Sequence, residues 1–138
     1  MLRSRWLLLL LPLLLLLTDA YGATLVERPP IAIPASATPE QVVNAVRGAF
    51  LHRGWVIAAE QPGRMEGVLH HKERTLRVAI GYDAQKITIG YVSSENMDYA
   101  QGPHGAEIDR KYASWVKYLD EDIHTGLSGT GLGGGTPK

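Results

Sequence analysis

The chain contains no cysteine, and this absence sets the first limits on its class. No disulfide can form, and no lipid can be attached through a cysteine at the cleavage site of an export signal. Small exported animal domains are more often held together by disulfides, so a cysteine-free exported domain suits a bacterial periplasm better. The stability of the folded chain must therefore come from an ordinary apolar core.

The chain also lacks an excess of charge of either sign. Its 138 residues include 14 basic and 14 acidic side chains, and removal of Arg3, Arg5 and Asp19 with the N-terminal segment leaves a net charge near −1. Proteins that bind nucleic acid carry a clustered positive field, so this balance argues against a nucleic-acid partner. The length is enough for one domain.

The first 22 residues have the three parts of a secretory signal. A basic region with two arginines precedes the run 6–17, which is apolar except for one proline. This run is shorter than the roughly 20 residues that span a bilayer. Small residues then favour cleavage after Gly22, with cleavage after Ala20 as the alternative. We therefore predict a periplasmic protein, and the alternative is a retained N-terminal membrane anchor.

The segment 23–37 is predicted to be an extended lead-in to the domain. Three of its residues are proline, which removes a backbone donor and fixes φ, so a helix is disfavoured. Ile31 and Ile33 alternate with small residues in this segment. This short alternation could add an edge strand to a sheet.

A helix is predicted over 39–53, at the start of a domain that spans 38–124. Thr38 is a good N-cap, and Gln41 stands at the spacing of a capping box. Apolar residues recur along the segment at helical spacing and form one stripe. Gly54 then suits the position just after a helix end.

The stretch 55–93 is read as four short strands in succession. In the third and fourth strands apolar residues alternate with polar or small ones, which is typical of half-buried antiparallel strands. The turn between these two strands fixes which residues pair, and a slip of one residue would turn the apolar set outward. The strands are expected at 55–60, 64–71, 74–82 and 86–93, and the pairs are Tyr82 with Ile87, Ile80 with Ile89 and Val78 with Tyr91.

A polar loop is expected over 94–105, followed by a second amphipathic helix over 106–124. The glycine-rich segment 125–138 has no apolar pattern, which predicts a disordered tail. One apolar sheet face and two apolar helix stripes must be buried together. We therefore predict an α+β two-layer sandwich, in which a four-stranded antiparallel meander carries two helices on one face, in the order α-β-β-β-β-α.

These segments resemble a family of small exported bacterial proteins, many of them lipoproteins. The shared pattern is W-x-[IV] before a PG turn, then I-x-Y, then I-x-Y-x-x-S-x-N-[LM]-x-Y, and a final helix with Y-x-x-W-[VI]; the match covers about 54–124. The family has no assigned activity, so the resemblance implies the fold and export but no mechanism. This chain lacks the cleavage-site cysteine of the lipoprotein members, so we expect no lipid anchor.

Two groups of residues suggest metal binding, and neither has the spacing of a metal site. The chain has no H-x-H or H-x-x-x-H pair, and the neighbours His70 and His71 would point to opposite faces of a strand. Asp120, Glu121 and Asp122 follow one another in the second helix, where consecutive side chains do not converge, so we predict a solvated helix end. The five histidines are His52, His70, His71, His104 and His124.

The loop 93–99 is the densest polar group outside the helices. Ser94 with His104 as its base would give a small hydrolase that uses the loop 93–104, but no nucleophile elbow or oxyanion-hole glycines frame this serine. Ser and Asn side chains in such loops commonly bond the backbone and fix a turn. Asn96 is therefore interpreted first as a capping residue, and a ligand role is the alternative.

The outer face of the predicted sheet carries small residues in its centre. Glycine inside a strand often marks the close approach of a ligand or another backbone. Arg77, Lys86 and Val92 flank the expected pairs, which are Ala79 opposite Gly90 and Gly81 opposite Thr88. This patch could accept a partner protein or a flat ligand, and the alternative is a tolerated small surface.

We therefore predict an exported accessory or binding protein that has no catalytic motif, no cofactor and no enzyme activity. Its partner would be an envelope protein or a small ligand on the outer sheet face and the loop 93–99. The alternatives are a small hydrolase and a weak metal-binding protein. The candidate contact residues are Arg77, Ala79, Lys86, Gly90, Val92, Ser94, Asn96 and Tyr99.

Overall fold

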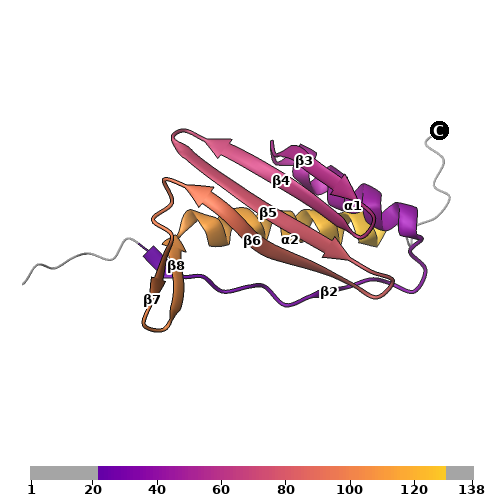
Figure 1. The fold of residues 1–138 in the computed structure, drawn as a ribbon. Coiled ribbons are helices and arrows are strands. Elements are labelled where there is room, and N and C mark those ends of the chain that lie inside the picture. The colour runs from indigo at the N-terminus through magenta and orange to yellow at the C-terminus, as the bar shows by residue number, and fades with distance from the viewer. Residues whose placement is uncertain (1–21, 130–138) are drawn as a thin grey trace, which may run out of the picture.

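A five-stranded antiparallel sheet forms the centre of the fold in the computed structural model, which describes residues 22–129 (Figure 1). Its strand order is β2-β6-β5-β4-β3, so four strands that follow one another along the chain also lie side by side. The strands are β2 (Ile31–Ala32), β3 (Val56–Gln61), β4 (Arg64–His71), β5 (Arg74–Tyr82) and β6 (Lys86–Glu95).

Two helices cover one face of this sheet, and a small second sheet lies at one end of the domain. Both helices lie behind the five-stranded sheet in Figure 1, and the hairpin β7–β8 projects below β6. The second sheet has the order β1-β8-β7. These elements are α1 (Pro39–His52), α2 (Lys111–Ser128), β1 (Gly22–Thr24), β7 (Ala100–Gly102) and β8 (Gly105–Asp109). The α+β class predicted from the sequence is therefore confirmed.

The first helix begins where its capping residues predict. The Thr38 hydroxyl accepts a hydrogen bond from the Gln41 backbone N–H at 3.2 Å, and the Gln41 side chain accepts one from the Thr38 N–H at 2.8 Å. This reciprocal pair satisfies two backbone donors that the helix itself leaves free. Gly54 follows the helix with a φ of 79°, a conformation that favours glycine.

The register of β5 and β6 is the predicted one. Tyr82 pairs with Ile87, Ile80 with Ile89 and Val78 with Tyr91, and on the other face Ala79 pairs with Gly90 and Gly81 with Thr88. The inner set packs on the helices, and Leu76, Val78, Ile80 and Ile87 are fully buried. The pairing shifts between Arg77 and Val78, where Val92 of β6 is the extra residue of a bulge.

The predicted four-stranded sheet is wrong in strand number. Residues Ile31–Ala32 form β2, which pairs with the start of β6 and adds a fifth strand at the edge. Ile31 is buried there, so the short alternation in the lead-in was a real strand signal. The backbone of this lead-in gains hydrogen-bond partners from the sheet that a free segment would lack.

The predicted limits of the second helix are also wrong. Residues predicted as loop and first helical turn form β7 and β8, and Ile108 is buried from β8 rather than from a helix. The helix continues to Ser128, past the predicted end at His124, because Leu127 adds another buried residue to its apolar stripe. The predicted tail therefore starts too early in the sequence.

The predicted signal, residues 1–22, lies outside the described residues except for Gly22, as does the segment 130–138. Gly22 is the first residue of β1 and pairs with Asp109 of β8. No helix within residues 22–129 is long and apolar enough to cross a membrane.

Candidate functional site on the outer face of the sheet

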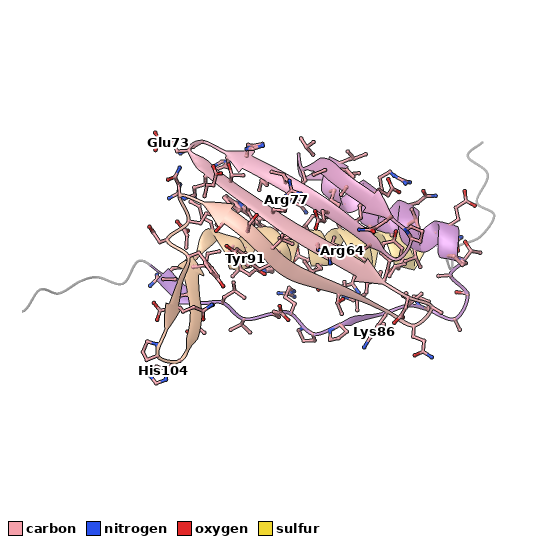
Figure 2. The ribbon with its side chains drawn as sticks, viewed as in Figure 1. Arg64, Glu73, Arg77, Lys86, Tyr91 and His104 are labelled. Atoms are coloured by element: carbon pink, nitrogen blue, oxygen red, sulfur yellow. The ribbon has the colours of Figure 1, made fainter. Side chains whose placement is uncertain are left out.

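No described helix covers the outer face of the five-stranded sheet (Figure 1). Side chains that alternate with the buried inner set project from it. In Figure 2, Arg64 and Arg77 lie over this face, whereas Lys86 lies at the turn between β5 and β6. Of the candidate contact residues predicted on β5 and β6, Arg77, Ala79 and Gly90 therefore share this surface, and Lys86 lies at its end. The bulge pairs Ser94 with the buried inner-face residue Leu76 instead.

Small residues occupy the middle of this face, and Gly90 has no steric reason to be glycine. A Cβ atom built on Gly90 would have only the Glu27 carboxylate within 4 Å, at 3.9 Å. Its neighbour across the strands, Ala79, is only 7% exposed although it points away from the helices. We call the small residues Ala79, Gly81 and Gly90 the strip. They lie between longer side chains, and glycine at position 90 leaves the surface there uncovered.

A charged cluster borders the strip on β4 and β5. The Glu66 carboxylate accepts hydrogen bonds from Arg64 Nη2 and Arg77 Nη1, both at 2.8 Å. The bond from Arg64 and then that from Arg77 hold the pKa of Glu66 below its ordinary value. The two guanidinium groups and the one carboxylate together carry a net positive charge beside the strip. The hydrogen bond to Glu66 holds the Arg77 side chain in place.

A groove of about 430 Å³ lies at the end of the strip near the turn between β4 and β5. Its apolar residues come from β3 and β4, and its polar residues come from β5, β6 and the end of β4. Arg77 and Ser94 from the predicted contact set both line it, so the structure brings these two together. The lining includes Val56, Ala58, Val68, His70, Thr75, Arg77, Ser93, Ser94 and Glu95.

Sequence reasoning missed the contributions of β3 and β4 to this surface. Met65 is fully buried, so alternation places Arg64, Glu66 and Val68 on the outer face. This alternation of outer and inner residues along β4 can be read from the sequence. The groove also needs Val56, which is 60% exposed, and its place beside β4 depends on the pairing of the strands.

The loop after β6 is held by its own side chains. The Ser94 and Tyr91 hydroxyls lie 2.9 Å apart, and Met97 is buried. The Tyr99 ring stacks on Tyr91 with a centroid distance of 4.5 Å. Asn96 Nδ2 donates to the Glu73 carbonyl oxygen at 2.7 Å. The capping interpretation of Asn96 is therefore supported, and Tyr99 is 41% exposed.

Replacing Asn96 with alanine is expected to reduce the free energy of unfolding by about 1 kcal/mol and to leave partner binding unchanged. The change removes the bond to Glu73 and places alanine at a φ of 56°, which it adopts less readily than asparagine. Thermal melting measures the loss. Asp98 has a similar φ of 53°, so Asp98→Ala is the control for the backbone term alone. Equal losses in the two variants would contradict the capping role.

The structure does not bring Ser94 and His104 together as a catalytic pair. The Ser94 hydroxyl lies 2.9 Å from the Tyr91 hydroxyl, and no hydrogen bond joins Ser94 to His104 within the described residues. His104 lies at the tip of the β7–β8 hairpin, well away from the labelled Tyr91 (Figure 2). The geometry therefore gives this serine no neighbouring base.

The histidines are scattered over the domain. His52 contacts Asp122, His70 contacts Thr75, and His71 meets the Trp115 ring edge-on. His124 lies 3.5 Å from Asp120 on the same helix. Within residues 22–129 no three His, Asp or Glu side chains come close enough together to hold a metal ion.

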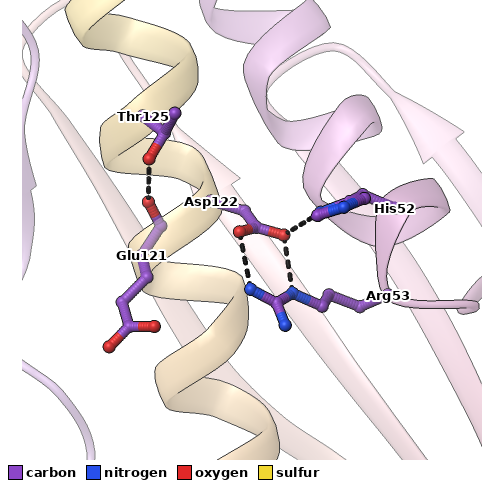
Figure 3. A network of polar contacts seen from close by, with 5 residues as sticks. All are labelled: His52, Arg53, Glu121, Asp122 and Thr125. Atoms are coloured by element: carbon purple, nitrogen blue, oxygen red, sulfur yellow. Dashed lines mark hydrogen bonds and ion pairs between the residues drawn. The ribbon is translucent and has the colours of Figure 1, made fainter.

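The prediction of a solvated end for the acidic run in α2 is wrong at two of its three positions. Asp120 is buried and forms an ion pair with Arg28 of the lead-in at 3.1 Å. Asp122 accepts hydrogen bonds from Arg53 Nε at 2.7 Å and Arg53 Nη2 at 2.9 Å (Figure 3). Glu121 alone is exposed. These acids hold other segments against α2, and spacing along one helix could not show that.

Comparisons with known proteins find no protein-family model, no curated protein and no solved structure that matches this chain. The family resemblance inferred from the sequence therefore stays a prediction.

Proposed function

We propose that this protein is an exported accessory or binding protein of the bacterial envelope, and that the outer face of its sheet contacts an envelope protein. The observation that carries the proposal is Gly90, a strand glycine at which an added Cβ atom would meet only the Glu27 carboxylate, at 3.9 Å. A larger residue there would suit the strand better, because glycine weakens a strand interior. A surface that must admit another molecule closely explains the small residue.

The neighbouring features support a protein contact. Beside the small strip lie the exposed Val92 and the apolar end of the groove, where Val56 is also exposed. The fixed Arg77 supplies a hydrogen-bonding group at the border between these regions. Protein interfaces commonly combine an apolar centre with an arginine that contributes much of the binding energy. Export from the cytoplasm is part of the same proposal and is supported by the signal-like N-terminus.

Replacing Gly90 with leucine is expected to reduce the yield of partner crosslinks at least tenfold without lowering the melting temperature. The leucine side chain would cover the strip, and its Cβ atom would meet only the Glu27 carboxylate, at an ordinary contact distance of 3.9 Å. A photo-crosslinking residue at Thr88, which is exposed on the same face, reports the partner in intact cells. We expect crosslinked species from Thr88 and their loss in the Gly90→Leu background.

Two matched controls define the outcome. Gly48→Leu makes the same change on α1, where nothing lies within 4 Å of the added atom, and it should leave the crosslinks intact. A crosslinker at Ala113, which is exposed on α2, should give no partner. Full crosslinking in Gly90→Leu, or none from Thr88 in the parent protein, would refute the proposed surface.

Native mass spectrometry of the protein purified from the cell envelope, without refolding, tests the remaining alternatives. A bound small molecule or metal would appear as added mass and would shift the proposal from a protein partner to that ligand. The intact mass also reads the cleavage site. Cleavage after Ala20 leaves β1 complete, whereas cleavage after Gly22 removes its first residue.

A further inference from the structure

A second hollow lies at the other end of the domain, away from the groove on the outer face. It has a volume of about 450 Å³, within the range of pockets that hold small molecules. The end of the lead-in, the first turns of α1 and the two turns β3–β4 and β5–β6 surround it. Its aliphatic lining includes Ile33, Ala37, Pro39, Val42, Val43 and Pro62.

The apolar core of the domain opens to solvent at this pocket. Val42 is buried, while Ile33, Val43 and Tyr82 are only partly buried and pack against the core from the pocket side. A ligand that filled the pocket would remove this apolar surface from water, which is favourable in proportion to the area covered. The pocket therefore favours an apolar ligand.

The lining also defines the shape of that ligand. Tyr82 is the one aromatic residue among the described residues around the pocket, and most of the others are branched aliphatic residues, alanines and prolines. A flat aromatic ligand gains most between two rings, and this pocket offers no second ring. A saturated hydrocarbon chain needs no ring opposite it, because it makes dispersion contacts with the aliphatic side chains that line this pocket.

The charge at the pocket selects the head group of the ligand. Asp83 is the one charged residue among the described residues that line the pocket. The charge of Lys86, which does not line the pocket, is the smallest of the influences on the Asp83 carboxylate. Its Oδ1 accepts hydrogen bonds from the backbone N–H of Gln85 at 2.7 Å and of Lys86 at 2.8 Å. These bonds lower the pKa of Asp83, so the carboxylate stays ionised at neutral pH. An anionic head group beside it would be repelled.

We propose that this pocket binds the saturated chain of a single-chain lipid with an uncharged head group, such as a monoacylglycerol. The chain lies against Val42, Val43 and Ile33, and the head group stays at the mouth near the β5–β6 turn. This site is separate from the outer sheet face and does not depend on the protein contact proposed above.

Titration of the purified full protein with monodecanoylglycerol, below its critical micelle concentration, tests the site by calorimetry. We expect saturable binding of one lipid for each protein chain. Decanoate at pH 8 has the same chain with an anionic head group, and it should bind at least tenfold more weakly. Equal binding of the two lipids would refute the role of Asp83, and absence of saturable binding would refute the site.

A matched pair of variants in the lead-in locates the binding. Ala37 lines the pocket, whereas Ala35 is exposed and does not. Ala37→Trp should reduce affinity for monodecanoylglycerol at least tenfold, and Ala35→Trp should leave it unchanged. If Ala37→Trp melts early, Val43→Phe fills the same space from α1 and decides the result. Unchanged binding in a folded Ala37→Trp or Val43→Phe variant would overturn the proposal.

The outer-face variant Gly90→Leu keeps the two proposals distinguishable. It should bind monodecanoylglycerol as the parent protein does, because Gly90 does not line this pocket. Loss of lipid binding in Gly90→Leu would contradict the pocket as the site. Loss of crosslinking in the same variant bears only on the protein contact.

Discussion

Replacing Gly67 with alanine is expected to lower the free energy of unfolding by about 3 kcal/mol, the largest loss among the single changes considered for this domain. A Cβ atom on Gly67 would lie 2.3 Å from Phe50 Cε1 and 2.5 Å from Phe50 Cδ1. These distances are far below van der Waals contact, so the ring or the strand must move. Phe50 is fully buried and packs against Trp55, with ring centroids 5.6 Å apart, which leaves the ring little space to retreat.

Chemical denaturation of the purified protein measures this loss, and Gly48→Ala is the matched control. Gly48 lies within α1 with nothing inside 4 Å of an added atom, so alanine there should stabilise the helix by up to about 1 kcal/mol. Phe50→Leu combined with Gly67→Ala should recover part of the loss by making room for the methyl group. A Gly67→Ala protein as stable as the parent would show that Phe50 does not pack on β4 as described.

The parts of the fold that could be predicted are those written in local patterns. Thr38 and Gln41 mark the start of α1 because their hydrogen bonds span only three residues. The alternation in β5 and β6, with a short turn between them, specifies their register. The strand β8 was missed because Ile108 stands four residues before Tyr112, a spacing that fits the helix stripe as well as it fits a strand followed by a helix.

The part of the candidate site that depends on the alternation of inner and outer residues along a strand could be predicted from the sequence. Ala79, Gly90 and Arg77 fall on the outer face because their neighbours in sequence fall on the inner face. Contacts between residues far apart in the sequence could not be predicted from this alternation. Nothing around Asp122 in the sequence points to Arg53, 69 residues earlier, and nothing near Gly67 indicates that a ring from α1 lies against it.

Replacing Asp122 with asparagine is expected to lower the melting temperature at pH 7 by roughly 5–10 °C. The Asp122 carboxylate joins the end of α1 to the middle of α2 through two bonds from Arg53 and a 2.7 Å contact with His52 (Figure 3). Asparagine keeps the shape but removes the charge. The Arg53 guanidinium, which also lies over the Tyr118 ring at 4.8 Å, would then lack its charged partner.

The pH dependence of this effect identifies the charge as its cause. The bond from Arg53 is the main reason that the pKa of Asp122 falls from 3.8 to about 2 in the folded protein. A carboxylate with a lowered folded pKa stabilises the native state above its unfolded pKa and loses that contribution as the pH falls through the folded value. The difference in stability between the parent and Asp122→Asn should therefore be full at pH 7 and should shrink as the pH falls from about 4 to about 2.

Urea denaturation of both proteins at pH 7, 4 and 2.5 gives the required differences in the free energy of unfolding. Glu121→Gln removes a neighbouring charge that is exposed on the same helix, where its ion pair with Lys117 spans 3.7 Å. It should change stability little at any of these pH values, because exposed pairs of this kind contribute little. A deficit in Asp122→Asn that stays constant down to pH 2.5 would mean that shape, and not charge, explains the role of Asp122 in joining the two helices.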